Sequence, residues 1–273
     1  MILLPLQVVG SQIQTSDGKR FKAVGCSDFG QFRRWLATPG HPEILVEPII
    51  DERTRLAREA GYTGPLVARV FRHAGPWNAF GIVDPWSYPM SAARDFTQFY
   101  GEKGWYVDWT GGDFQVCFPS ADPRLGEVDG PRGINQHNNE FCAAIYGLPN
   151  TIWNTCNEPP FNGVDTSRVK PPPWAPPVQY SGTYYEGAWN HATDLACINL
   201  HPARGDDDHG RVPKFVGKLF ESAVYLYRHG KPIFYDEPIG ADEVNIPGRR
   251  CNVPEYWFQM GLAIGLVDGL YFH

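Results

Sequence analysis

The sequence lacks the features that mark two broad classes of protein. It contains no basic run, and its 24 lysines and arginines are outnumbered by 30 aspartates and glutamates, which gives a formal net charge of −6. A nucleic-acid binder needs a positively charged stripe to neutralise phosphates. No stretch approaches the roughly 18 consecutive apolar residues of a membrane span. We therefore expect a soluble protein whose partners include neither nucleic acid nor membrane.

Cysteine is also sparse. The six cysteines are widely spaced and contain no Cys-x-x-Cys pair, and three of them lie inside apolar runs. Buried free thiols are therefore the default expectation. The apolar residues 1–9 lack a basic leader, sufficient length and a small-residue cleavage site, so no signal peptide is expected. The sequence assigns no compartment.

Aromatic residues, by contrast, are abundant. They make up 14% of the chain, with nine tryptophans and thirteen tyrosines, and aromatic faces stack on the C–H faces of sugar rings as well as filling cores. A chain of 273 residues that is 42% hydrophobic is long enough for one large core. Since α/β barrels of about 250 residues commonly stay undivided, we expect residues 1–273 to form a single domain.

Short β-rich runs alternate with helical segments along the chain, which predicts parallel strands joined by crossovers and hence an α/β fold, the (β/α)8 TIM barrel. A small hairpin within residues 1–20, predicted at residues 7–14 and followed by the Ser16-Asp17-Gly18 turn, precedes the barrel. The eight barrel strands are predicted at residues 21–26, 66–71, 105–109, 151–156, 178–185, 195–200, 232–236 and 266–272.

Helices are predicted between these strands, with some crossovers replaced by irregular loops. Asp51 is expected to cap a helix that follows a long loop, and Ser91 is expected to cap the next helix. Further helices are predicted at residues 131–146, at residues 213–228 and from Pro254 onward. The proline-rich residues 170–177 cannot sustain a helix, and we predict an ordered loop there over the barrel mouth. The sequence given stops directly after the eighth strand, so the last helix is expected to be absent from it.

Two glutamates carry the functional prediction. Glu158 follows the apolar run that ends at Trp153, and Glu237 follows residues 231–236 in the same way. Because the carboxyl ends of all barrel strands open at one mouth, the two carboxylates are expected to meet there. A pair of carboxylates facing one bond is what cleavage of a glycosidic linkage requires. The alternative for either glutamate is a salt bridge at the barrel rim.

The segment Asn157-Glu158-Pro159 resembles the Asn-Glu-Pro signature on strand four of the clan A retaining glycoside hydrolases, the cellulase- and mannanase-like TIM barrels. Residues 231–237 are similar to that clan's strand-seven segment. The resemblance covers nearly the whole chain. It implies hydrolysis of a β-linked polysaccharide or oligosaccharide without a cofactor, with Glu158 as the acid/base, Glu237 as the nucleophile and Asn157 bound to the sugar 2-hydroxyl.

The same resemblance supplies two further site residues. Arg69 resembles the clan's strand-two arginine, whose positive charge keeps the nucleophile ionised. Arg72 competes for that role, and one of the two is expected to point outward. His201 matches a strand-six histidine that orients the nucleophile or a sugar hydroxyl, with a structural histidine as the alternative.

The sequence also departs from the clan's pattern. Ala203 stands where a tyrosine commonly contacts the nucleophile, and strand eight lacks the tryptophan that forms a floor for the sugar. Tyr235, Tyr271 and His273 are candidates to replace these contacts. Alternation along the strand turns Asp236 away from the face of Glu237. Candidates to line a sugar cleft are Trp109, Trp153, Trp174 and Trp189, although Trp153 lies within a strand and is more typical of a core.

These departures motivate a second hypothesis, a carbohydrate-binding barrel of the virion-surface kind without turnover. A third, a metal-dependent hydrolase, rests on His201 and the acidic residues 206–208, which a solvated loop explains without any metal. No metal or cofactor is therefore expected. The particular sugar, endo or exo action, and the oligomeric state are left open by the sequence.

Overall fold

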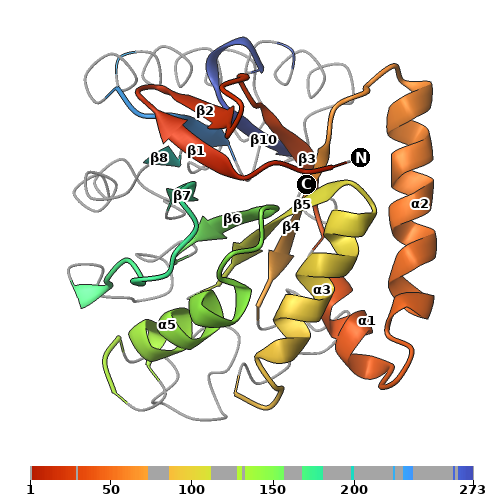
Figure 1. Ribbon diagram of the computed structural model, residues 1–273, viewed down its shortest axis with the longest axis vertical. Coiled ribbons are helices and arrows are strands. Elements are labelled where there is room, and N and C mark those ends of the chain that lie inside the picture. Colours follow the sequence, from red (N-terminus) through yellow and green to blue (C-terminus); the bar gives the residue numbers. More distant parts are fainter. Residues whose placement is uncertain are drawn as a thin grey trace, which may run out of the picture.

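The computed structural model describes residues 2–28, 30–72, 86–111, 128–130, 133–156, 168–180, 198–199, 224, 230–235, 261 and 264–272. Eight parallel strands form one sheet in the order β7-β6-β5-β4-β3-β10-β9-β8 (Figure 1). This is the strand order of a (β/α)8 barrel, in which each strand lies beside its neighbours in the sequence and the last lies beside the first. The predicted TIM-barrel fold is confirmed.

Each predicted barrel strand overlaps an observed one. The second, β4 (Leu66–Phe71), has the predicted bounds, whereas the fifth and sixth are only two residues long. The others follow the chain in order: β3 (Ala23–Ser27), β5 (Trp105–Thr110), β6 (Thr151–Asn154), β7 (Gln179–Tyr180), β8 (Ile198–Asn199), β9 (Ile233–Tyr235) and β10 (Gly269–Phe272).

The helices agree with the sequence less well. Both α3 (Ser91–Glu102) and α5 (Ile134–Ile145) lie where helices were predicted, but Ser91 is the first residue of α3 and Met90, not Ser91, is its cap. In contrast, α1 (Gln31–Ala37) falls in a predicted loop, and α2 (Glu43–Glu59) begins eight residues before Asp51. Asp51 is wrong as a cap: it lies inside α2, where its carboxylate bonds Lys103 at 3.1 Å. The helices predicted at 213–228 and from Pro254 lie mostly outside the described residues.

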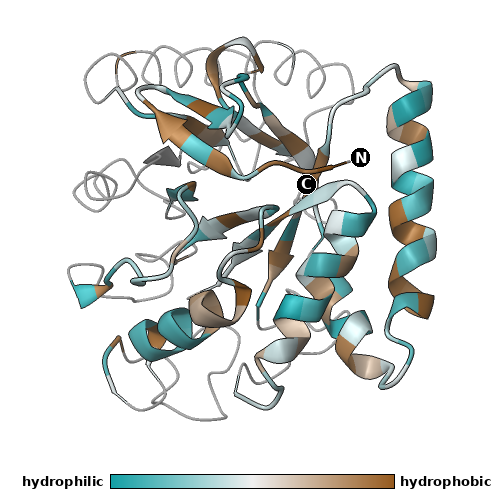
Figure 2. Cartoon of the chain, in the orientation of Figure 1, coloured by the Kyte–Doolittle hydropathy of each residue, from teal (hydrophilic) through white to brown (hydrophobic). Residues whose placement is uncertain are grey.

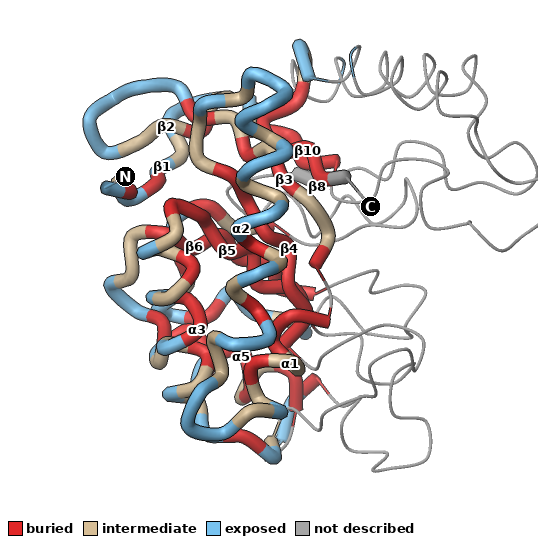
Figure 3. The backbone as a smooth tube through the Cα atoms, turned by 90° about the vertical axis from the view of Figure 1, so that its right-hand side faces the viewer, coloured by how far each residue is buried: buried red, intermediate tan, exposed pale blue. Residues whose placement is uncertain are grey.

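The strands separate two layers of core. On β4, Val67 belongs to the cluster inside the barrel, whereas Ala68 and Val70 belong to the cluster between the sheet and helices α1, α3 and α5. Successive side chains of a strand point to opposite faces, so this assignment extends to the neighbouring positions of each strand. Figure 3 shows β4 and β5 as almost continuously buried. Figure 2 shows hydrophobic and hydrophilic residues alternating around α2.

The predicted hairpin is present and closes the amino end of the barrel. Strands β1 (Leu6–Val9) and β2 (Gln12–Thr15) pair antiparallel across a turn in which Gly10 has a φ of 56°. Ile13 is completely buried and packs against the cluster inside the barrel. The Tyr106 hydroxyl, at the base of that cluster, donates to the Leu4 carbonyl at 2.6 Å. In Figure 3 the hairpin lies at one end of the strands.

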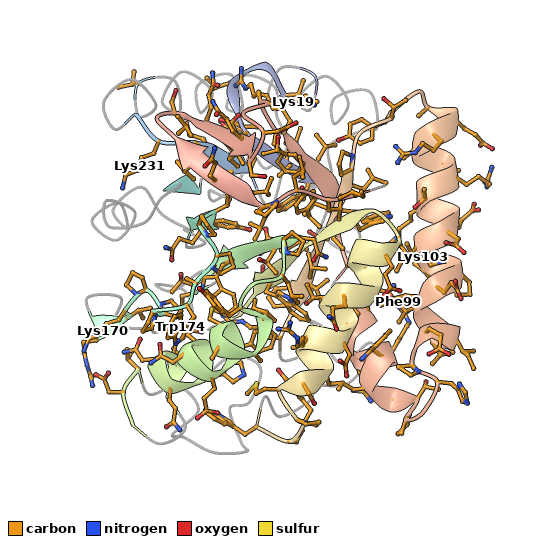
Figure 4. All side chains as sticks on the ribbon, viewed as in Figure 1. Lys19, Phe99, Lys103, Lys170, Trp174 and Lys231 are labelled. Carbon is orange, nitrogen blue, oxygen red and sulfur yellow. The ribbon has the colours of Figure 1, made fainter. Side chains whose placement is uncertain are left out.

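The proline-rich segment runs down the outside of the barrel. Near the start of α5, the Lys170 amide donates to Asn135 Oδ1 at 2.9 Å, and just after the end of α5 the ring of Trp174 lies 5.1 Å from that of Tyr146 (Figure 4). For residues 168–178 the predicted irregular conformation is confirmed, but the predicted placement over the mouth is wrong. The physical reason is that the chain must return from the carboxyl end of β6 to the amino end of β7.

Candidate active site

The two predicted catalytic glutamates lie just beyond described strands. The structure describes the chain to Cys156 after β6 and to Tyr235 at the end of β9. Glu158 and Glu237, together with Asn157, His201 and His273, lie outside the described residues. What the structure supplies is the frame: β6 and β9 belong to one parallel sheet, so their carboxyl ends open toward the same mouth.

Arg69 lies inside the barrel. It follows Val67 by two positions on β4 and therefore shares its inward face, and its side chain is completely buried. The guanidinium carbon lies 5.4 Å from the centre of the Phe71 ring. In the sheet register, Arg69 pairs with Ser27 on β3 and with Asp108 on β5.

Asp108 is a buried interior carboxylate that the sequence analysis missed. It is completely buried, and its Oδ2 accepts a hydrogen bond of 2.6 Å from the Tyr180 hydroxyl. The Tyr180 ring stacks on that of Phe234, with centroids 4.4 Å apart and planes inclined by 15°. The available signal was a single acid within an apolar strand, because buried charges are retained only when they are paired or hydrogen-bonded.

Arg72 takes the opposite direction from Arg69. Its guanidinium lies 4.1 Å from the centre of the Trp153 ring, on the helix side of the sheet. It donates to Asn138 Oδ1 of α5 and to the Asn154 carbonyl at 3.2 Å. The expectation that one of the two arginines points outward is confirmed, and the outward one is Arg72.

The candidate tyrosines divide between the two faces. Phe234 contributes to the interior cluster, so its neighbour Tyr235 is turned to the helix side, where it is completely buried. This placement contradicts the prediction that Tyr235 contacts a sugar at the mouth. Tyr271, by contrast, belongs to the interior cluster, with its ring 6.2 Å from that of Phe234.

Two of the tryptophans predicted to line a sugar cleft, Trp109 and Trp174, lie away from the mouth. Trp109 is completely buried among the rings of α1, α3 and α5, and its indole N–H donates to Thr97 Oγ1 at 3.0 Å. It has no free face for a sugar. Trp174 is 51% exposed but packs on Tyr146 near the amino ends of the strands. Both predictions are wrong. The face of a strand on which Trp109 lies, and the path of the crossover that carries Trp174, cannot be read from the composition of the sequence.

An acidic group at the end of β3 belongs to the helix layer. The Asp28 carboxylate is nearly buried and forms an ion pair with Arg53 of α2. Burial raises the pKa of this carboxyl above its ordinary value, and the charge of Arg53 opposes that rise. Burial also raises the pKa of the neighbouring Cys26 thiol to about 12, so it stays protonated. Cys26, Cys142 and Cys156 are free, in agreement with the expectation of unpaired thiols.

No membrane span or metal centre is visible in the described part of the chain. None of its helices combines the length and the apolar character that crossing a bilayer demands. Within the same residues, no three His, Cys, Asp or Glu side chains gather as metal ligands would. His201 and the acidic residues 206–208 lie outside that part.

No known family model matches the sequence, and no curated protein matches it. The fold, in contrast, matches solved structures. The mannohexaose complex of Thermomonospora fusca β-mannanase aligns with a TM-score of 0.57 and 11% identity over 98% of this chain and 84% of that one. A Saccharophagus degradans β-glucanase in complex with cellotetraose aligns with a TM-score of 0.56 and 11% identity over 100% of this chain and 86% of that one.

The catalytic domain of a mannanase from Streptomyces sp. SirexAA-E gives a TM-score of 0.56 at 9% identity over 98% of this chain and 80% of that one. At these identities the likeness establishes the fold. The chain therefore has the barrel fold of these mannanases and glucanases. At the level of the fold, this confirms the resemblance that was based on residues 157–159 and 231–237.

Proposed function

We propose that this protein is a retaining glycoside hydrolase acting on a β-linked polysaccharide or oligosaccharide, with residues 1–273 as one catalytic domain. One observation carries the proposal: β6 and β9 are parallel strands of a single barrel, and each leads within a few residues to one of the two candidate glutamates. The match to solved mannanases and glucanases supports the same reading at the level of the fold.

The proposed reaction is a double displacement. Glu237 attacks the anomeric carbon while Glu158 protonates the leaving oxygen, and water deprotonated by Glu158 then hydrolyses the glycosyl-enzyme. This mechanism requires the two carboxyl groups to lie about 5–5.5 Å apart. Asn157 binds the sugar 2-hydroxyl, and Arg69 keeps the nucleophile ionised from inside the barrel. His201 orients the nucleophile or a hydroxyl, and His273 lies beside the sugar. No metal or cofactor takes part.

Soluble β-mannan and β-glucan are the first substrates to test, because two of the matching structures hold mannohexaose and cellotetraose. Release of reducing sugar measures turnover, and proton NMR of the first product identifies the anomer. We expect the β-anomer, since two displacements retain the configuration. A 2-fluoro β-glycoside that matches the accepted sugar should then label Glu237 in a peptide identified by mass spectrometry.

Two matched substitutions test the roles of the glutamates. Glu158→Gln and Glu237→Gln should each lower kcat by about 10²-fold or more. Asp236→Asn is the control. Asp236 directly precedes Glu237, so it tests whether the nucleophile is the neighbouring carboxylate instead. Label on Asp236, or loss of activity only in Asp236→Asn, would overturn the assignment of the nucleophile.

The sequence departs from the clan's pattern at Ala203 and in β10, and these differences motivate the competing hypothesis of a barrel that binds carbohydrate without hydrolysing it. Affinity electrophoresis measures binding of mannan or glucan. Binding with no hydrolysis of either polymer and no label on Glu237 would contradict the enzyme hypothesis and support a carbohydrate-binding barrel.

A further inference from the structure

Arg72 has no role in the proposed reaction, yet its side chain makes several hydrogen bonds and aromatic contacts. It follows β4, is completely buried, and lies between the sheet and α5. Its guanidinium stacks over the ring of Trp153 at 4.1 Å and lies 5.7 Å from the centre of Phe141. These aromatic faces fix the plane of the group and stabilise its charge away from water.

The donors of Arg72 converge on the exit of β6. Nη2 lies 3.2 Å from the carbonyl oxygen of Asn154, the last residue of the strand, and 3.4 Å from that of Thr155. Nη1 donates to Asn138 Oδ1, and the Nδ2 of the same amide donates to the Thr155 carbonyl at 3.2 Å. One arginine and one asparagine therefore hold two consecutive carbonyls immediately before the segment that carries Asn157 and Glu158.

Arg72 is itself anchored by its backbone. Its amide donates to the Thr110 carbonyl of β5 at 2.9 Å, and its own carbonyl accepts the Tyr88 hydroxyl at 2.6 Å. The residue after β5 leaves room for the guanidinium: a Cβ on Gly111 would lie 2.4 to 2.6 Å from three of its atoms. The side chain thus links the carboxyl ends of β4, β5 and β6.

We propose that Arg72 is a positioning residue that fixes the exit of β6 so that Asn157 and Glu158 are presented to the barrel mouth. The catalytic consequence rests on the proposed function. The structural part does not, because it concerns the carbonyls of Asn154 and Thr155. The planar guanidinium reaches Asn138 from Nη1 and both carbonyls from Nη2, whereas lysine would have to reach all three from a single nitrogen, so lysine is not an equivalent replacement.

Arg94 offers a matched control. It also donates to two backbone carbonyls, of Ala144 at 3.0 Å and of Tyr146 at 3.2 Å, but it does so at the end of α5 that lies near the amino ends of the strands. Loss of either arginine removes bonds to two backbone carbonyls, and loss of Arg72 also removes the bond to Asn138. Only the loss of Arg72 should disturb the exit of β6.

The experiment compares Arg72→Lys with Arg94→Lys by hydrogen exchange and by kinetics, well below the melting temperature. In Arg72→Lys we expect the amides of residues 155–158 to exchange at least about tenfold faster, the factor that corresponds to one hydrogen bond of a charged donor. We expect kcat to fall by a similar factor with KM within about twofold, since substrate binding is retained while Glu158 is misplaced. Arg94→Lys should change neither quantity.

If Arg72→Lys fails to fold, Asn138→Ala removes the second donor to the Thr155 carbonyl and should give the same exchange signature. Unchanged exchange at residues 155–158 overturns the proposal, as does an equal effect in Arg94→Lys. Faster exchange with unchanged kcat overturns the catalytic part. A wild-type protein that hydrolyses no glycan overturns the proposed function, and the exchange result then decides the structural part alone.

Discussion

Arg69 and Asp108 occupy paired positions on neighbouring strands of the barrel, and both side chains are completely buried on its inner face. The Asp108 carboxylate is held by the Tyr180 hydroxyl at 2.6 Å. A basic and an acidic side chain at one level of the barrel interior offset part of each other's cost of burial. Arg69 therefore sits in a preorganised surrounding, which suits a fixed positive charge that acts on a carboxylate at the mouth.

The first prediction concerns the charge of Arg69. In Arg69→Met, the nucleophile loses the positive charge that lowers its pKa, so the acidic limb of kcat/KM should move to higher pH by about one to three units. The measurement is kcat/KM against pH on whichever polymer the wild type hydrolyses. Tyr180→Phe is the control, because it removes the hydroxyl and keeps both charges; its acidic limb should stay in place. An unmoved limb in Arg69→Met would remove Arg69 from the mechanism.

The second prediction uses the raised pKa of Asp28. Burial makes the folded carboxyl harder to ionise than the unfolded one, whose ordinary pKa is 3.8, while Arg53 opposes this effect. The folded state therefore binds the proton more tightly, and the contribution of Asp28 to stability is greatest below that value and falls as pH rises above it. Relative to Asp28→Asn, which does not titrate, the wild type should lose free energy of unfolding as the pH rises above the ordinary pKa of 3.8 and through the raised pKa of the folded carboxyl.

Urea denaturation of both proteins at several pH values measures this difference. Arg53→Met sharpens the test, since loss of the opposing charge should raise the pKa of Asp28 further and extend the decline to higher pH. A free-energy difference between wild type and Asp28→Asn that does not depend on pH would show that Asp28 titrates alike in both states.

The sequence predicted β4 and the hairpin well because each has a local signal. Pro65 and Arg72 bracket the mostly apolar β4, and the Ser16-Asp17-Gly18 turn follows directly after the strand pair, which itself turns at Gly10. The short helix α1 has no such signal: its first turn lacks a side-chain cap, and it forms because Phe32 and Trp35 are buried against α3. Its stability comes from tertiary packing rather than from propensity.

The faces of the barrel strands could not be predicted for a different reason. Strands such as β4 and β5 are buried on both sides, so their hydrophobic pattern is continuous and does not separate inside from outside. The sequence therefore left the choice between Arg69 and Arg72 open and placed Trp109 at the sugar cleft. The neighbouring strands and helices decide both cases.

The third prediction tests the close approach of β3 and β4. A Cβ built on Gly25 would lie 1.7 Å from the Val67 carbonyl oxygen, so Gly25→Ala must push two paired strands apart. We expect a loss of about 3 kcal/mol or more in the free energy of unfolding, at the upper end of overpacking. Gly265 is the matched control. It is helical, exposed and has no heavy atom within 4 Å of a built Cβ.

Because alanine suits a helix better than glycine, Gly265→Ala should raise stability by about 0.5–1 kcal/mol. Thermal and urea unfolding of the two variants give the comparison. Equal stabilities for Gly25→Ala and the wild type would show that β3 and β4 can separate without cost.

The fourth prediction compares Trp109 and Trp174, two of the four tryptophans that the sequence offered as candidates for a sugar cleft. Trp109 is completely buried among aromatic rings of three helices, so Trp109→Ala should lower the free energy of unfolding by about 3–5 kcal/mol. Trp174 is half exposed and contacts Tyr146 near the amino ends of the strands. Trp174→Ala should therefore cost less than about 1 kcal/mol.

The kinetic contrast completes the test of Trp174. Because it lies near the end of the barrel that the hairpin closes, kcat/KM of Trp174→Ala on soluble polymers should stay within about twofold of the wild type, the range of a residue outside the site. Circular dichroism follows unfolding in both variants, since their fluorescence differs. A large rise in KM for Trp174→Ala would show that the polymer also binds along the outer face of α5, and the cleft would then extend beyond the mouth.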